Sequence, residues 1–139
     1  MPTVKGHCLC GATEYTVKLE SPSHILCHCD TCKVQSGSAF TLNTVVPQED
    51  FQLTKGTLGK YSYTGDSGNP VHCFFCPTCT THVYHHQTVA GPNYVIRTAS
   101  LEGAKDWPIA AEIFKKDGVK WQADVADKDH VFQKLPPSS

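Results

Sequence analysis

The 139-residue chain lacks the features that mark membrane, nucleic-acid-binding and helical proteins. No apolar run approaches the roughly 20 residues needed to span a bilayer. The twelve basic residues are scattered, and Lys115 and Lys116 form the only adjacent pair, so no basic stripe could follow a phosphate backbone. No segment sustains helical periodicity, and no internal repeat is evident. These absences favour a small β-rich protein with no nucleic-acid partner and no membrane partner.

The N-terminal residues also lack the apolar segment of a secretory signal peptide. Residues 1–6 read Met-Pro-Thr-Val-Lys-Gly and lead directly into a cysteine pair. We therefore expect a soluble protein in the reducing cytoplasm, where structural disulfides are rare. At this length, with 40% hydrophobic residues, we expect one domain over residues 1–135 and a loose tail over 136–139. The expected assembly is a monomer or homodimer.

Cysteine, in contrast, is abundant: the chain has eight, in three tight groups. An even number would suit a disulfide scaffold, but cysteines in Cys-x-Cys and Cys-x-x-Cys spacing bridge one another only with strain. The same spacings direct two sulfurs at one tetrahedral ion. Zinc is favoured over an iron–sulfur cluster, which uses other cysteine spacings. The groups are Cys8-Leu9-Cys10, Cys27-His28-Cys29-Asp30-Thr31-Cys32 and Cys73-Phe74-Phe75-Cys76-Pro77-Thr78-Cys79.

Alternation of polar and apolar residues predicts a mainly β fold of antiparallel sheets with very little helix. Asp117-Gly118 is predicted to form a hairpin turn, and short helical turns are expected only after Cys29 and before Phe51. The cysteine groups would then lie in turns and at strand ends. The predicted strands span residues 13–19, 39–46, 59–64, 71–75, 82–86, 94–98, 110–114 and 119–122.

Ligand counting divides the cysteines into two unequal zinc sites, two ions per chain. Four thiolates close a tetrahedron, which leaves no position for substrate and makes such a site structural. Cys27, Cys29 and Cys32 offer only three thiolates from one short segment, and the fourth position is then open to water or substrate, as in catalytic zinc sites. The four ligands expected in the structural site are Cys8, Cys10, Cys76 and Cys79.

Three motifs together identify a family resemblance. They are Gly6-His7-Cys8-Leu9-Cys10-Gly11, Cys27-His28-Cys29-Asp30-Thr31-Cys32 followed by Ser36-Gly37-Ser38, and Phe75-Cys76-Pro77-Thr78-Cys79. This set resembles the glutathione-dependent formaldehyde-activating enzyme family, which includes centromere protein V. Trp107-Pro108 and Trp121 are similar to the family's C-terminal Pro and Trp positions. The resemblance implies a zinc-bound β-tent, with the four-cysteine site structural and the three-cysteine site active.

The resemblance also implies a reaction, the addition of glutathione to formaldehyde to give S-(hydroxymethyl)glutathione. A zinc held by three soft thiolates favours a thiol as its fourth ligand. The functional hypothesis is therefore a zinc-dependent carbon–sulfur lyase that forms or breaks the adduct of a glutathione-like thiol with an aldehyde. Three alternatives remain: the same fold acting on another aldehyde or imine, a non-catalytic zinc-stabilised binding module, and a redox switch in which Cys29 and Cys32 form a disulfide.

Two residues beside the three-cysteine group have two interpretations each. His28 is expected either to shuttle a proton or simply to point outward. Asp30 is expected either to act as a general base or hydrogen-bond acceptor near the zinc, or to cap the turn. Lys33 is the only obvious cation nearby, which is few for a substrate with two carboxylates such as glutathione.

Several residues further along the chain are also ambiguous. Cys73, at a position that is usually not cysteine in the family, would be a small buried hydrophobe or an extra ligand that closes the three-cysteine site. Arg97, the sole arginine, is expected on a solvent-facing strand position rather than as a carboxylate clamp. Strand alternation would put His82 and His86 on one face and His85 on the other.

Thr80 is the second departure from the family pattern. Family members usually carry glycine directly after the last cysteine of the Cys-x-x-Cys turn. A left-handed backbone at this position is less easily adopted by threonine than by glycine.

Overall fold

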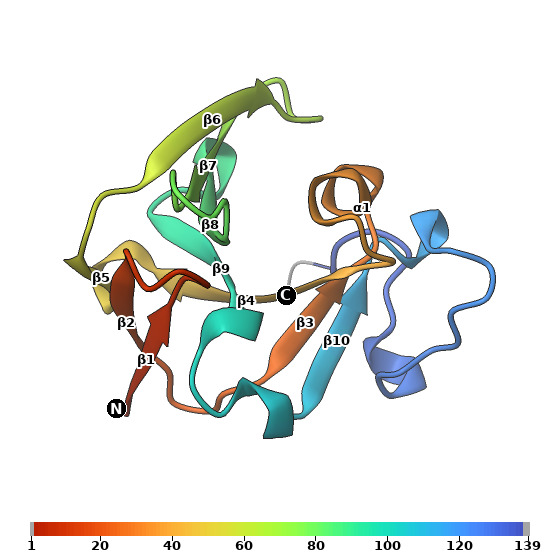
Figure 1. Cartoon of the computed structure of the whole chain (residues 1–139). Helices are drawn as coiled ribbons and strands as arrows, with labels where there is room; N and C mark the ends of the chain where they lie inside the picture. Colours follow the sequence, from red (N-terminus) through yellow and green to blue (C-terminus); the bar gives the residue numbers. More distant parts are fainter. Residues whose placement is uncertain (1, 138–139) are drawn as a thin grey trace. The chain divides into compact units, whose positions relative to one another are not determined.

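The structure is a computed structural model that describes residues 2–137. It is mainly β, which confirms the predicted fold class, and its residues divide into two compact units (Figure 1). The first unit contains the residues up to Ser21 and Thr44–Ala104. The second contains Pro22–Asn43 and the residues from Lys105 onward.

A three-stranded antiparallel sheet lies in the first unit. Its strands are β1 (Thr3–His7), β2 (Glu14–Lys18) and β5 (Phe51–Lys55), with β2 in the middle. Tyr15 and Val17 are buried and alternate with exposed Glu14 and Lys18, so β2 has the period of a half-buried strand, as predicted. The sequence analysis did not predict β1 or β5.

Four further strands of the first unit form an antiparallel run in the order β9-β8-β7-β6, which confirms four predicted strands (Figure 1). A stack of aromatic rings joins strands β7, β8 and β9 to β5. The Tyr84 ring lies between those of Phe74, at 4.5 Å, and Tyr94, at 4.4 Å, and Phe51 of β5 approaches Tyr84 at 4.7 Å. The strands are β6 (Gly59–Thr64), β7 (Pro70–Phe75), β8 (His82–Gln87) and β9 (Asn93–Arg97).

A β-bulge interrupts the pairing of β7 with β8. Phe74 lies opposite Tyr84 but Phe75 lies opposite His82, so β8 has one extra residue, Val83. The extra residue reverses the alternation of side chains along β8. As a result the rings of His82 and His85 are 6.0 Å apart, and the prediction that they take opposite faces is wrong.

In the second unit the strand β3 (His24–Cys27) pairs with a strand on each side. It pairs antiparallel with the first residues of β4 (Thr41–Pro47), a predicted strand that continues into the first unit. On its other side β3 pairs in parallel with β10 (Ile109–Ile113), with Ile113 opposite Cys27. The parallel pair and β3 itself were not predicted. The single α-helix of residues 2–137, α1 (Asp30–Ser36), follows β3 directly, where the sequence predicted a helical turn.

The predicted hairpin at Asp117-Gly118 is wrong. Phe114 adopts a left-handed conformation with φ 53°, and Lys115–Asp117 form a 3-10 turn, so the chain leaves the sheet after β10. Residues 119–122 form no strand. The chain returns later, because Phe114 N–H donates to Lys134 O at 3.0 Å.

Short 3-10 helices fill several of the connections, including the turn predicted before Phe51. Among residues 2–137, no helix is both long and apolar enough to cross a membrane. Ser138 and Ser139 of the predicted tail lie outside the described residues, and the single domain over 1–135 stays a prediction. The 3-10 helices are η1 (Gln48–Asp50), η2 (Thr88–Ala90), η3 (Thr98–Ser100), η4 (Ala104–Asp106), η5 (Lys115–Asp117) and η6 (Lys128–His130).

Gly6→Ala tests the packing of β1. A Cβ at Gly6 would collide with Tyr15 Cε2 and lie 2.8 Å from Leu101 Cδ2, so the buried side chains would have to move. Overpacking of this kind costs about 1–3 kcal/mol of unfolding free energy, measurable by chemical denaturation. The control is Thr3→Ala, an exposed position on the same strand, which should change stability by less than about 0.5 kcal/mol. Equal stability of both variants would contradict the packing.

Candidate metal centres

The first centre consists of four thiols in the first unit, the set predicted for the structural zinc. The sulfurs of Cys8, Cys10, Cys76 and Cys79 all lie within 4.8 Å of one another. Cys8 Sγ is 3.7 Å from Cys10 Sγ, and Cys10 Sγ is 3.8 Å from Cys76 Sγ. A tetrahedral zinc with Zn–S bonds of about 2.3 Å requires sulfurs about 3.8 Å apart. The donor set and its spacing therefore fit a four-thiolate zinc.

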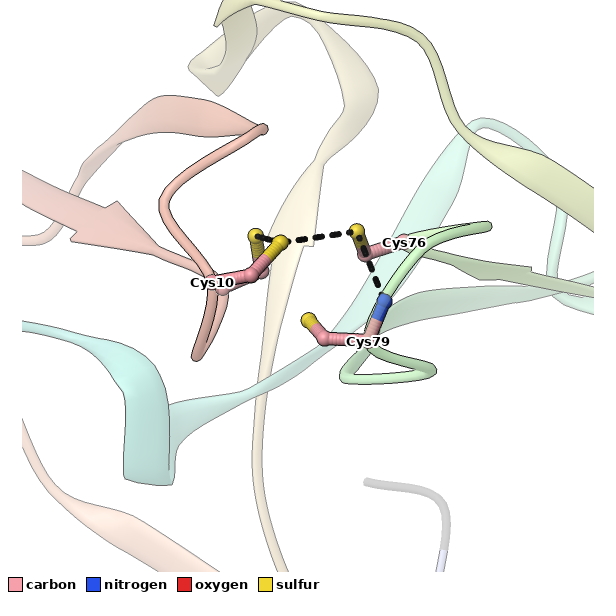
Figure 2. A group of neighbouring side chains, drawn as sticks. Cys10, Cys76 and Cys79 are labelled. Carbon is pink, nitrogen blue, oxygen red and sulfur yellow. Dashed lines mark hydrogen bonds between the residues drawn. The ribbon is translucent and has the colours of Figure 1, made fainter.

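Two tight turns direct these sulfurs at one point. Cys10 comes from the turn between β1 and β2, and Cys76 and Cys79 come from the turn between β7 and β8 (Figure 2). In the second turn the Cys79 N–H donates to Cys76 Sγ at 3.5 Å. The turns are also joined directly, because Leu9 N–H donates to Thr81 Oγ1 at 3.1 Å. The first centre thus links the two sheets of its unit.

The second centre is the three-thiol group of the second unit. The sulfurs of Cys27, Cys29 and Cys32 lie within 4.8 Å of one another. Among the described residues of this unit, 22–43 and 105–137, the group consists of these three thiols. Cys27 ends β3, and Cys29 is the N-cap of α1, where its Sγ accepts a hydrogen bond from Cys32 N–H at 3.3 Å. The strand end and the first helical turn therefore bring the three sulfurs together, and this donor set also fits zinc.

Neighbouring groups disturb the pKa values of the thiols in both centres. Hydrogen bonds from Thr81, its side chain first, lower the pKa of Cys79 to about 5. Burial acts to raise the pKa of Cys8, but hydrogen bonds from Thr13 and the adjacent thiols bring it down to about 7. In the second centre, hydrogen bonds with Cys29 and Cys32 raise the pKa of Cys27. Thiols this close compete for negative charge, and a divalent cation stabilises their ionised forms together.

His28, between two ligands of the second centre, is fully buried, so the interpretation that it points outward is wrong. Its Nε2 lies 2.8 Å from Glu112 Oε1, and Glu112 is also fully buried. The sequence analysis missed Glu112. The available signal was a lone carboxylate within the apolar run Ile-Ala-Ala-Glu-Ile, because a carboxylate in a buried strand requires partners.

Asp30 and Lys33, the other polar residues predicted beside the second centre, contact each other. Their ion pair is 3.0 Å long, and Lys33 Nζ also donates to the Asp117 carbonyl. The Asp30 side chain is 79% exposed, in the first turn of α1. A role for Asp30 near the zinc stays a prediction.

Cys73 and Arg97 both lie in the first unit and are both buried. Cys73 is on β7, 3% exposed, opposite Tyr61 on one side and His85 on the other. This burial agrees with a small core residue, and its role as an extra ligand stays a prediction. Arg97 ends β9 and is 9% exposed, so the expectation of a solvent-facing strand position is wrong.

The fold and the two thiol groups define a small β protein with one four-cysteine and one three-cysteine group, each of which could hold a metal ion. A family model described as glutathione-dependent formaldehyde-activating enzyme matches residues 3–117. The chain belongs to this family. Both thiol groups lie inside the matched range.

Two further proteins are similar to the chain. A curated protein of Schizosaccharomyces pombe, named uncharacterized lyase C29B12.13, is 26% identical over 132 residues, which are 95% of this chain and 92% of that protein. A crystal structure of a Rhodobacter sphaeroides protein has a TM-score of 0.59 and 24% identity, covering 76% of this chain and 99% of that one. The second likeness supports the fold alone. Family and curated relative together support an enzyme of the lyase type.

Thr80→Gly should stabilise the protein. Thr80 has φ 68°, a left-handed conformation that costs a β-branched residue about 1–2 kcal/mol relative to a right-handed one. Glycine adopts it freely but loses the hydrogen bond from Thr80 Oγ1 to Cys79 O, so we expect a net gain of about 0.5–1 kcal/mol in unfolding free energy. The metal-loaded protein is compared in thermal and chemical denaturation.

Thr78→Gly is the matched control for this change. Thr78 lies in the same turn and is exposed like Thr80, but its φ is not positive. Glycine there should lower stability, because it only adds flexibility to the unfolded chain. A loss of stability in both variants would contradict strain at Thr80.

Proposed function

We propose that the protein is a zinc-dependent carbon–sulfur lyase that binds a small glutathione-like thiol at the second centre. It forms or breaks the adduct of that thiol with an aldehyde such as formaldehyde. Membership of the family supports this reaction, and the lyase name of the fission yeast relative agrees with it.

The observation that carries the proposal is the difference between the two thiol groups. Four sulfurs at tetrahedral spacing fill the coordination of one zinc, whereas three sulfurs leave one position for an exogenous ligand. We therefore assign Cys8, Cys10, Cys76 and Cys79 to structural zinc. Cys27, Cys29 and Cys32 are the ligands of the active zinc.

The reaction needs only a soft cation and good positioning. When bound, zinc favours the ionised form of a soft thiol. In the forward direction one S–C bond forms, the carbonyl π bond breaks, and the thiol proton ends on the former carbonyl oxygen. Holding both reactants in contact removes the entropic cost of bringing them together. For an addition that needs no redox step, this proximity supplies a large part of the rate enhancement.

The residues of the second unit hold this geometry. The backbone N–H of His28 donates to Ile113 O at 3.0 Å, so the segment after Cys27 continues the pairing of β3 with β10. The α1 cap fixes Cys29 relative to Cys32, and Gly37 with φ 66° ends the helix one residue after Ser36. The thiols are therefore held by regular structure on both sides.

One observation favours a different substrate in the same reaction class. Glutathione has two carboxylates, which cationic side chains would recognise. Two mostly buried lysines of the second unit already have carboxylate partners: Lys33 pairs with Asp30, and Lys115 lies 3.5 Å from Glu112 and 3.3 Å from Asp124. A smaller thiol, or another aldehyde or imine substrate, is thus the second candidate.

Cys29→Ser should remove one of two zinc equivalents per chain and abolish turnover. Serine keeps the N-cap of α1, because a hydroxyl also accepts from a backbone N–H, while a neutral hydroxyl is a poor zinc ligand. Metal is counted by elemental analysis, and turnover is followed as formation of the thiol–aldehyde adduct by NMR. The control, Cys73→Ala, should keep two zinc equivalents and measurable turnover. Undiminished turnover in Cys29→Ser would overturn the assignment.

Cobalt substitution tests whether a thiol enters the second centre. The visible spectrum of the Co²⁺-loaded protein should change when glutathione or 2-mercaptoethanol is added, because a new sulfur ligand alters the charge-transfer bands. Cys29→Ser loaded in the same way should show no such change. An unchanged spectrum in the unsubstituted protein would favour the non-catalytic zinc-stabilised module. A response to 2-mercaptoethanol but not to glutathione would favour a smaller thiol.

A further inference from the structure

We propose that Glu112 is a positioning residue of the second centre, and that it acts through His28 to hold the Cys27–Cys32 segment in its metal-binding conformation. The inference rests on the second centre of the proposed function. It concerns a residue that contacts no thiol itself.

The His28–Glu112 contact is a fully buried polar pair. The distance between His28 Nε2 and Glu112 Oε1 is 2.8 Å, and both side chains have 0% exposure. A charged or polar group in such a position is costly unless its hydrogen bonds are complete. The pair therefore persists only in a geometry that satisfies both partners.

Glu112 is held firmly by other donors. Its Oε2 accepts from the backbone N–H groups of Val125 and Ala126 at 2.7 and 3.0 Å, and Lys115 Nζ lies 3.5 Å from Oε1. Burial acts to raise the pKa of Glu112, but these donors outweigh the effect of burial and hold the pKa below its usual range. An ionised carboxylate fixed by two backbone groups is a rigid acceptor for the imidazole.

The imidazole of His28 depends on that acceptor for its orientation. His28 Nδ1 is buried and has no hydrogen-bond partner in the described structure, so the Nε2 contact is the ring's one polar anchor. The ring also packs against Phe40, with centroids 5.5 Å apart, and near Gly118, where an added Cβ would lie 3.5 Å from Nδ1. Because His28 separates Cys27 from Cys29, the ring's position constrains the directions of both neighbouring thiols.

Glu112→Gln preserves the size of the side chain and breaks this arrangement in either amide orientation. If the amide oxygen faces His28, the NH₂ group faces the Val125 and Ala126 N–H donors. If the amide is reversed, its NH₂ group faces His28 Nε2, which accepts a hydrogen bond only in the tautomer that carries its proton on the buried Nδ1, an atom without a partner. Either orientation therefore leaves at least one N–H donor without its acceptor: the Val125 and Ala126 N–H groups in the first, and the His28 Nδ1–H in the second.

The test measures zinc affinity of each centre in the full-length protein, by competition with a chromophoric chelator. Cys29→Ser identifies the signal of the second centre. Glu112→Gln should raise the zinc Kd of the second centre about 10–100-fold, the usual effect of removing a group that orients a metal site. The Kd of the first centre, which lies in the other unit, should stay within about twofold. A second-centre Kd within about twofold of the unsubstituted protein would overturn the inference.

Asp124→Asn is the matched control. It removes a carboxylate 3.3 Å from Lys115, as Glu112→Gln removes one at 3.5 Å, but Asp124 is 56% exposed and makes no contact with His28. It should leave both Kd values unchanged. A loss equal to that of Glu112→Gln would show an effect of local charge and overturn the positioning role.

The double variant Glu112→Gln with His28→Gln tests whether Glu112 acts through His28. The double variant should bind zinc at the second centre no more weakly than the weaker single variant, because both changes break one pathway. If the losses of zinc affinity in the two single variants multiply in the double variant, Glu112 does not act through His28 and the proposed route is overturned. If Glu112→Gln does not fold, Glu112→Asp replaces it. That variant keeps the charge and shortens the reach, so the inference requires weaker second-centre binding there, and unchanged binding overturns it.

These measurements do not depend on turnover. A protein in which Glu112→Gln weakens the second centre but no thiol enters it would retain the positioning role and lose the proposed function. A protein with thiol entry and turnover but unchanged affinity in Glu112→Gln would lose the positioning role alone.

Discussion

The first unit depends on sulfur atoms from distant turns lying within a few ångströms of one another. Cys10 and Cys76 are 66 residues apart in sequence, and their sulfurs are 3.8 Å apart. Nothing apolar is gained by crowding four thiols, and their ionised forms repel one another unless a cation lies between them. A metal bound there would therefore contribute directly to folding, because it would close a long loop and tie the β1–β2 turn to the β7–β8 turn. Coordination bonds would then do in this chain, whose eight cysteines are free thiols, what disulfides do in secreted domains of similar size.

The second centre is built in the opposite way. Its three sulfurs come from a single six-residue segment, so little chain entropy is lost in bringing them together. A short segment on its own is flexible, however, and its shape comes from neighbours that are remote in sequence. Ile113 lies opposite Cys27 in the parallel pair, and Glu112 anchors the imidazole between two ligands. Long-range support for local ligands would suit the proposed role of this site, which is to bind metal and still admit a substrate.

The gathering of seven cysteines into one four-thiol and one three-thiol group could be predicted from sequence, because it follows from their spacing and from the number of thiolates that a tetrahedral ion binds. Strands with clear alternation, such as β2 with buried Tyr15 and Val17, were predictable for the same local reason. β3 was not, since four residues ending in a cysteine carry too little pattern, and its parallel partner β10 lies more than 80 residues later. The left-handed Phe114 replaced the Asp117-Gly118 hairpin, and the Val83 bulge reversed the histidine faces. Both are backbone irregularities set by tertiary packing. Glu112 was missed because its partner, His28, is distant in sequence.

The order of the second centre's parts along the chain has a consequence for biosynthesis. A polypeptide leaves the ribosome from its N-terminus, and its early segments begin to fold first. All ligands of the first centre have been made once Cys79 has emerged, whereas Glu112 and the backbone groups of Val125 and Ala126 follow much later. The nascent chain would thus complete its four-thiol centre first. A translation product stalled before residue 112 would have a finished structural centre and a three-thiol segment without its support.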